Sequence, residues 1–339
     1  MFVAKPNSVR FPVSLKTADT RSPAPADASH SEQRAALLAL LEMLRIENYR
    51  FVTATPATHA RVVARPDRQE ARSLRDVLGW SLPFRADVVP PRILDLMRAA
   101  VVVQERPGGW LASTVRVSSV RDCLFLHSAY PTNAEDSVFL GPDSYRFADL
   151  IVAKRKLPGS GARILDYAAG AGVGGVTATV GQNGAQLTLA DINAKALFLA
   201  GINAEHAGLN AKTAKVRAPG DLAGPFDLIV THPPFMIDDD KRFYRDGGDL
   251  WGSQLSFDWV LAGTRLLAPG GQLIMHTGVS IVEGRDVLLE RLRDALPRLG
   301  CSLWYHELDP DIFGDEMSKP AYAQVERIAA VGVVVTRDG

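Results

Sequence analysis

Cysteine is nearly absent from this chain of 339 residues, which contains only Cys123 and Cys301, far apart in the sequence. No Cys-x-x-Cys pair and no cluster of Cys and His at metal-ligand spacing occurs, so we expect neither a structural zinc site nor another bound metal. Two buried, reduced thiols are typical of a reducing compartment, and we therefore expect a cytoplasmic protein.

Net charge and long apolar runs are also lacking. Lys+Arg and Asp+Glu both number 38, so the formal net charge is zero, unlike that of proteins that coat long nucleic acids. No run of about 18 apolar residues is present, which excludes a membrane span, and the N-terminus lacks the apolar core of a secretory signal. With 47% hydrophobic residues, the composition is that of a globular protein with a sizeable core.

Residues 1–136 contain no recognisable chemical motif. Residues 1–30, rich in Pro, Ala and Ser, predict a flexible leader, after which Ser31 can cap a helix. Alternating apolar and polar residues over 110–127 predict a small antiparallel sheet. We therefore expect an α+β accessory domain over 31–136 that helps to select the substrate. Its arginine-rich stretch 61–75 is either a solvated helix face or a contact surface for an anionic substrate.

From residue 137 onward, strand-like and helix-like segments alternate. Strands are predicted at 163–167, 186–190, 213–218, 226–231, 272–276, 301–307 and 328–336, and helices at 145–153, 193–207, 252–267 and 284–296. This alternation predicts an α/β fold over 137–339: a doubly wound, Rossmann-like and mostly parallel sheet with helices on both faces. Sheets of this kind bind ligands beyond the carboxyl ends of their strands.

A glycine-rich turn, 166–175 (DYAAGAGVGG), follows the first of these strands. Glycine lets the backbone approach a ligand closely, and the helix that begins here points free N–H groups toward it. Asp191 ends the second strand, at a spacing from Gly170 that allows a carboxylate to accept both hydroxyls of a ribose. The glycines at 170, 172 and 175 also fit G-x-G-x-x-G, which alone would suggest a nicotinamide dinucleotide.

Two features favour a different ligand. Asp166 lies inside the end of the strand, where a carboxylate is unfavourable beside a pyrophosphate but suits a cationic amino group and a sulfonium. At the end of the fourth strand, in 231–235 (THPPF), two prolines stiffen an extended loop and Phe235 presents an aromatic face. A hydride-transfer enzyme has no obvious need for such a loop.

With these motifs in this order, residues 140–339 resemble the class I S-adenosylmethionine-dependent methyltransferases, in the branch with an Asn-Pro-Pro-Tyr/Phe motif. That branch includes protein-glutamine N5-methyltransferases and small-domain rRNA guanine-N2 and tRNA adenine-N6 methyltransferases. The resemblance implies S-adenosyl-L-methionine as the cofactor and in-line methyl transfer as the reaction. It also implies the cofactor-binding residues, namely Asp166, Ala168, Gly170 and Gly172 at the methionine part, Asp191 at the ribose, Asp221 and Leu222 at the adenine, and Tyr145 (in 141–146, GPDSYR), Ile192 and Thr231 around them.

This chain departs from the family motif at two positions. Ala168 stands in place of the usual first glycine, and His232 stands in place of the usual Asn. In the family that side-chain oxygen accepts an N–H of the target nitrogen. A neutral histidine can accept through one ring nitrogen or act as a general base. We expect His232, Pro233 and Phe235 to be the catalytic residues, with Phe235 packing against a planar acceptor; His232 as a mere scaffold is the alternative.

The loop 236–251 is expected to act as a lid or an acceptor-binding segment, because it carries Tyr244 and Trp251 together with Gly247 and Gly248 as a hinge. A solvated acidic loop is the alternative. His276 ends the next strand and is either a substrate-binding residue or a satisfied buried histidine. A metal site around the late cluster of His306, Asp309, Asp311 and Glu316 is the alternative to the expected absence of bound metal.

The sequence therefore predicts a methyltransferase that acts on nitrogen of a small molecule, a peptide or a protein side chain. An RNA base is the second choice of acceptor rather than the first, because the chain offers little basic surface for a nucleic acid. An NAD(P)-dependent oxidoreductase and a noncatalytic regulator that binds the cofactor are alternatives of other classes. Neither the identity of the acceptor nor the oligomeric state follows from the sequence.

Overall fold

The computed structural model describes residues 25–156, 159–238 and 245–339. Its N-terminal part consists of α1 (Pro25–Ile46), α2 (Pro56–Val63), α3 (Leu74–Leu78), α4 (Pro91–Ala99), β1 (Val103–Arg106), β2 (Trp110–Ser113), β3 (Val115–Val120) and β4 (Cys123–Ser128). The strands form two antiparallel hairpins, β1–β2 and β3–β4, where we predicted one small antiparallel sheet. Helix α1 begins at Pro25 rather than at Ser31, since proline fits the first turn of a helix, so 25–30 are not part of a leader.

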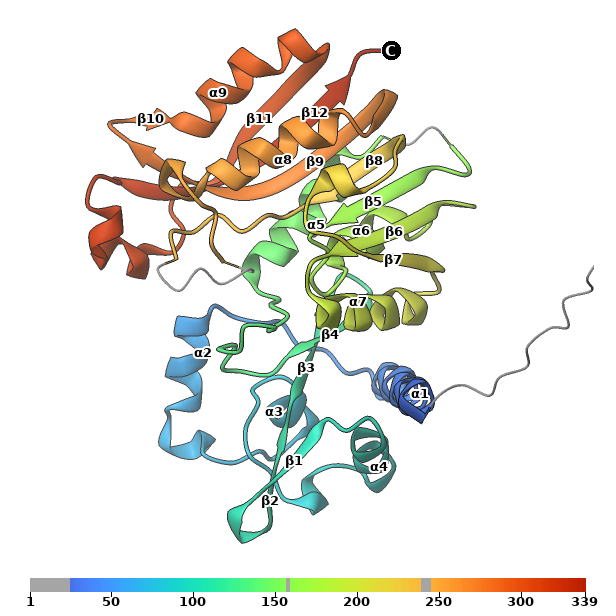
Figure 1. The fold of residues 1–339 in the computed structure, drawn as a ribbon. Coiled ribbons are helices and arrows are strands. Elements are labelled where there is room, and N and C mark those ends of the chain that lie inside the picture. Colours follow the sequence, from blue (N-terminus) through green and yellow to red (C-terminus); the bar gives the residue numbers. More distant parts are fainter. Residues whose placement is uncertain (1–24, 157–158, 239–244) are drawn as a thin grey trace, which may run out of the picture.

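The remaining chain builds the predicted sheet. Its elements are α5 (Pro142–Lys154), β5 (Arg163–Tyr167), α6 (Val173–Thr179), β6 (Gln186–Asp191), α7 (Ala194–His206), β7 (Ala211–Lys215), β8 (Phe226–Thr231), α8 (Gln254–Thr264), β9 (Leu267–Val282), β10 (Arg285–Asp286), α9 (Val287–Ala295), β11 (Cys301–Asp309) and β12 (Arg327–Arg337). The strand order is β11-β12-β9-β8-β5-β6-β7. Figure 1 shows α8 and α9 on one face of the sheet and α5, α6 and α7 on the other.

Strand directions confirm the predicted fold class. Strands β9, β8, β5, β6 and β7 are mutually parallel, while β12 runs antiparallel between β9 and β11. The result is a doubly wound, Rossmann-like and mostly parallel sheet. Each predicted strand is present, but β9 is much longer than the predicted 272–276. Its second half pairs with the first half of β12, so the partner strand rather than local apolar periodicity sets its length.

One hydrophobic core joins the N-terminal part to the sheet. It runs from α1 and α4 through the β3–β4 hairpin to α5, α6 and α7. At its centre the buried amide of Asn203, on α7, accepts the N–H of Leu126 (2.8 Å) and donates to the carbonyls of Leu126 (3.0 Å) and Ala171 (2.9 Å). This amide ties the hairpin to the glycine turn. The division into domains at residues 136 and 137 stays a prediction.

Both cysteines are free, Cys301 buried and Cys123 half-buried, so only the former has the full burial that we predicted. Among the described helices, none combines the length and the apolar character needed to cross a membrane.

Candidate active site

Three neighbouring strands end at the same level. Tyr167, the last residue of β5, is paired with Ala190 of β6 and with Thr231, the last residue of β8. The buried hydroxyl of Thr231 donates to the carbonyl of Tyr167 (2.8 Å) and holds two of these ends together. The glycine turn, Asp191 and His232 therefore meet at one edge of the sheet. Because neighbouring strands lie about 4.8 Å apart, the β6 and β8 positions are separated by about 10 Å.

The glycine turn is held in left-handed backbone conformations. Ala168, Gly170 and Gly172 have φ angles of 59°, 52° and 81°. A Cβ at Gly172 would lie 3.1 Å from that of Ala200, so this position needs a glycine, whereas a Cβ at Gly170 would meet no atom within 4 Å. Gly170 thus leaves open space above the turn, and Ala168 keeps the turn conformation at some cost in strain.

Asp166 is a buried carboxylate that no cationic side chain of the described residues neutralises. It is 1% exposed, and its Oδ2 accepts the N–H of Gly175 in the first turn of α6 (2.7 Å). Burial raises its pKa to about 7, and the nearby Asp191 contributes in the same direction. Asp166 therefore lacks a countercharge among the described residues, and a cationic group bound beside it would favour its ionised form.

Asp191 is fixed in position by the backbone around it. Its Oδ2 accepts the N–H of Gly170 (2.9 Å), and its Oδ1 accepts the N–H of Asn193 (2.8 Å). Burial raises its pKa, while these backbone N–H groups oppose that rise. Each carboxylate oxygen has a second lone pair, so two hydroxyl groups can still donate to it. The next residue, Ile192, is half-buried at the same edge.

Two of the predicted cofactor residues have other partners. Asp221 is exposed, and its Oδ2 accepts the N–H groups of Arg217 (3.0 Å) and Ala218 (3.1 Å), which closes its own turn. Tyr145 was expected to cover the cofactor, but its hydroxyl accepts the N–H of Thr53 (2.9 Å) in the N-terminal part. Leu222 packs against the apolar cluster on the α8 face of the sheet. Contact of these residues with a cofactor stays a prediction.

The ring of His232 is held in one tautomer. Its Nδ1 lies 2.7 Å from the backbone carbonyl of His276. A carbonyl only accepts, so this nitrogen carries the hydrogen and Nε2 of the neutral ring carries the lone pair. Among the described residues, none is hydrogen-bonded to Nε2. The rings of Phe147 and Phe235 lie close to it, with centroids 5.7 Å and 5.8 Å from that of His232.

His276 supports His232 from inside the sheet. Its ring is 0% exposed, and burial lowers its pKa well below the ordinary value, so it is neutral. Its Nδ1 lies 3.4 Å from Nδ1 of His232, while Nε2 has no partner in the described part of the chain. His276 is thus buried, as the alternative expected, but its ring is not fully satisfied, because Nε2 has no partner among the described residues. Direct contact of His276 with a substrate stays a prediction.

Phe235 does not present the aromatic face that we predicted. It is 8% exposed and packs in a cluster with Met236, Ile312, Tyr322, Val325, Ile328 and Ala330. Glycine at 278, on β9, makes room for the ring, since a Cβ there would overlap it. The buried Phe235 therefore anchors the double-proline loop, and Pro233 is buried beside it.

The loop after Phe235 is only partly described. Tyr244 lies outside the described residues. Trp251 is half-buried, and its carbonyl accepts the hydroxyl of Ser280 (3.0 Å). Gly247 packs so closely on the backbone of Gly252 that a side chain would overlap it, which argues against a hinge at this position. A substrate-binding role of Trp251 stays a prediction.

The late acidic cluster is engaged in ion pairs. Arg146 on α5 donates to Asp143 (3.1 Å) and to Asp309 (2.7 Å), and Glu316 accepts from Lys319 (2.6 Å). Within the described ranges, no group of three or more His, Cys, Asp or Glu side chains could hold a metal ion.

Sequence reasoning missed the residues that support this site. Phe147 contacts His232, Asn203 anchors the glycine turn and Gly278 accommodates Phe235. Only Gly278 gave a signal, since a glycine inside a strand often marks the close approach of another group.

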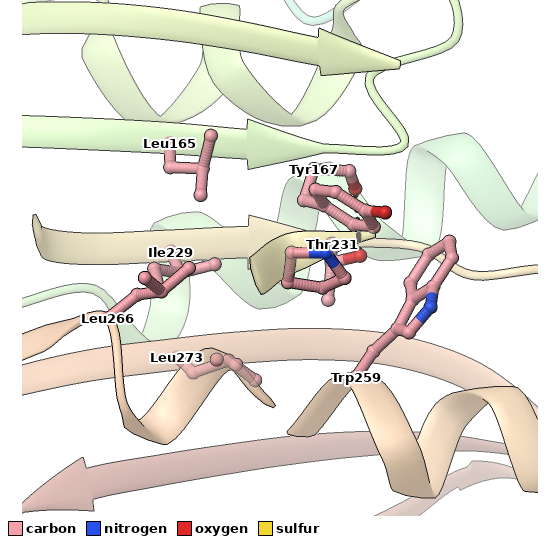
Figure 2. A pocket seen from close by; sticks show the side chains of 9 residues that line it. Leu165, Tyr167, Ile229, Thr231, Trp259, Leu266 and Leu273 are labelled. Carbon is pink, nitrogen blue, oxygen red and sulfur yellow. Dashed lines mark hydrogen bonds between the residues drawn. The ribbon is translucent and has the colours of Figure 1, made fainter. Parts of the chain in front are cut away.

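Figure 2 shows a small apolar pocket behind the strand ends, between β5, β8 and α8. Tyr167 and Trp259 meet there edge to face, with ring centroids 4.6 Å apart. The open space of about 10 Å³ suits a single water molecule, so this pocket is too small for a nucleoside.

Comparisons with known proteins agree with this arrangement. Residues 149–277 match the family model described as "Methyltransferase small domain". A release factor glutamine methyltransferase of Deinococcus radiodurans is 32% identical over 164 residues, which cover 45% of this chain and 55% of that protein. A ribosomal RNA small subunit methyltransferase C of Serratia proteamaculans is 28% identical over 145 residues, which cover 37% and 41%.

The chain thus spans about half the length of these curated relatives, or less. Among solved structures, a ribosomal protein L11 methylase from Lactobacillus delbrueckii subsp. bulgaricus has a TM-score of 0.40 at 15% identity, over 58% of this chain and 79% of that one.

Proposed function

We propose that this chain, which carries a class I methyltransferase fold of the small-domain branch predicted from its motifs, transfers a methyl group from S-adenosyl-L-methionine to a nitrogen atom. One observation supports this above the others. The strand register brings the glycine turn, the fixed carboxylate of Asp191 and the double-proline corner at His232 to the same edge of the sheet.

The residues at this edge fit the donor. Gly170 leaves open space above the turn, so a ligand can lie against the backbone there. Both oxygens of Asp191 have lone pairs for the ribose hydroxyls. Asp166 has no countercharge within the described ranges and a pKa raised to about 7 by burial, so the cationic amino group or sulfonium of the donor would favour its ionised form. A nicotinamide dinucleotide would instead bring its anionic pyrophosphate beside this carboxyl group and oppose its ionisation, which disfavours that alternative.

His232 positions the acceptor. When bound, the donor supplies a methyl carbon that is attacked by the lone pair of the acceptor nitrogen as the bond to sulfur breaks. The Nε2 lone pair of His232 accepts an N–H of that nitrogen and orients it, because Nδ1 is already committed to His276. The neighbouring rings of Phe147 and Phe235 restrict rotation of the imidazole. Orientation of this kind provides much of the rate enhancement in a displacement without a covalent intermediate.

The acceptor is a small molecule, a peptide or a protein side chain. The identity of 32% to a release factor glutamine methyltransferase supports a protein amide or a similar group. The match to an rRNA methyltransferase supports an RNA base as the second candidate. The exposed arginines of the N-terminal part, which include Arg61, Arg65 and Arg72, are compatible with that second candidate.

Donor carrying a deuterated methyl group tests the proposal. The purified protein is incubated with this donor and a cell extract, and the peptide, nucleoside and small-molecule fractions are analysed by mass spectrometry. Label above that of an Asp191→Ala control is expected in the peptide or small-molecule fraction. Label in nucleosides would assign the RNA alternative, and a complete lack of label above the control would contradict methyl transfer.

A further inference from the structure

A buried arginine in the N-terminal part has no countercharge. Arg116, on β3, is 2% exposed, and its Nε donates to the carbonyl of Ser128 (3.0 Å). Among the described residues, no carboxylate forms an ion pair with it, and both Nη groups have no hydrogen-bond partner. Such a buried, uncompensated charge is costly and needs an explanation. Arg68 in this part, by contrast, forms an ion pair with Asp76 (2.7 Å).

The surroundings of Arg116 do not supply the missing negative charge. Tyr145, Tyr49 and Tyr130 act on it electrostatically, and Arg116 in turn acts on His59 and His127, which carry no negative charge. Burial raises the pKa of Tyr49 and Tyr145, so their hydroxyls are neutral. Burial lowers the pKa of Arg116 to about 10, which leaves the guanidinium charged at neutral pH.

A second unpartnered polar group lies opposite Arg116. His127, on β4, is its direct partner in the register of the hairpin, so the two side chains share one face. His127 is 0% exposed, its Nε2 lies 2.8 Å from the hydroxyl of Ser118, and its Nδ1 has no partner. Ser118 is bonded in turn to the hydroxyl of Thr53 (2.5 Å). When Ser118 donates to Nε2, Nδ1 of His127 carries a hydrogen and is an unused donor.

This face of the hairpin adjoins the methyltransferase fold. Tyr145, which acts on Arg116, lies near the start of α5 and accepts the N–H of Thr53. Phe147, two residues further along the same helix, contacts His232. The same helix therefore has residues that interact with Arg116 and with His232.

We propose that Arg116 and His127 form a binding site for an oxyanion, a phosphate or a carboxylate group. The two Nη groups of Arg116 can donate to two oxygens of such a group. Nδ1 of His127 can donate to one of its oxygens as a third hydrogen bond. The site stands independently of the proposed function.

The test measures anion binding to the full chain by calorimetry and thermal unfolding, with inorganic phosphate and acetate as separate probes at constant ionic strength. The wild type is expected to bind one of the two anions saturably and to unfold at a higher temperature in its presence. Arg116→Gln is expected to weaken this binding roughly ten- to hundredfold, the effect of losing charged hydrogen bonds. Arg68→Gln, in which a paired arginine is changed, should bind the anion as the wild type does.

Phosphate binding assigns the site to a phosphate group, and acetate binding assigns it to a carboxylate. If Arg116→Gln fails to fold, the imidazole signals of His127 in the wild type provide the second measurement, since the bound anion should shift them. Lack of binding by the wild type to both anions would overturn the proposal, as would unchanged binding in a folded Arg116→Gln variant or unchanged His127 signals at saturation.

Discussion

Asp166→Asn tests the electrostatics of the glycine turn. The asparagine oxygen can still accept the N–H of Gly175, but the side chain no longer ionises. In the wild type, burial raises the pKa of Asp166 from 3.8 to about 7. Between these two pH values the folded protein holds a proton that the unfolded chain has released. The free energy of unfolding therefore falls as the pH rises through this window. Above about pH 7 the contribution of the bound proton to stability is lost.

The size of this fall follows from the pKa difference. A shift of about three units at about 1.4 kcal/mol each corresponds to about 4 kcal/mol, of which about 3 kcal/mol is lost between pH 5 and pH 8. Asp166→Asn lacks this term, so the free energy of unfolding of the variant minus that of the wild type should rise by about 3 kcal/mol over that interval. Urea unfolding of both proteins at the two pH values measures this difference.

Asp227→Asn provides a matched control, because Asp227 also accepts a backbone N–H, that of Arg163 (2.8 Å), but is only half-buried. The pH dependence of its free energy of unfolding gives the baseline for the same Asp-to-Asn change on the neighbouring strand. If the difference between Asp166→Asn and wild type is the same at pH 5 and pH 8, Asp166 ionises as an ordinary carboxylate and the argument from burial is refuted.

Four substitutions test the remaining contacts. Asp191→Ala should weaken binding of S-adenosylhomocysteine roughly ten- to hundredfold by calorimetry, because the lost hydrogen bonds are to a charged group. His232→Ala should slow methyl transfer roughly hundredfold or more and leave donor affinity unchanged. Turnover equal to that of the wild type would show that His232 is only a scaffold. Gly278→Ala should cost about 1–3 kcal/mol in urea unfolding, since the new methyl overlaps Phe235. Asn203→Ala should cost about 3–5 kcal/mol, because three buried backbone groups lose their partner.

Matched controls separate these effects from general damage. Gly314→Ala adds the same methyl where no atom lies within 4 Å, so its stability should equal that of the wild type. A Gly278→Ala variant as stable as Gly314→Ala would show that Phe235 is not confined by β9. Similarly, an Asn203→Ala variant that unfolds in two separate transitions, with the sheet as stable as before, would contradict a single core shared with the N-terminal part.

Local pattern was sufficient to predict the sheet and its glycine turn. Short apolar runs located the parallel strands, because such strands are buried on both faces. The turn needs glycine at 172, where α7 approaches. Asp191 was predictable because the length of one strand–helix–strand unit fixes its distance from the turn. Parallel strands end at one edge, so the association of Asp191 with His232 followed as well.

Contacts between distant segments were not predictable in this way. The burial of Phe235 depends on Gly278 and on a cluster that includes Ile312 and Tyr322, more than 70 residues further along. The hydroxyl of Tyr145 turns to Thr53 because the hairpin packs against α5, which no local period encodes. The tautomer of His232 likewise depends on a carbonyl of another strand.

A crystal structure of the protein with S-adenosylhomocysteine tests the central claim most directly. We expect the ligand across the carboxyl ends of β5, β6 and β8, with its ribose hydroxyls on Asp191, its amino group toward Asp166 and its sulfur facing His232. A ligand bound anywhere else, or this edge left empty at saturating concentration, would contradict the account.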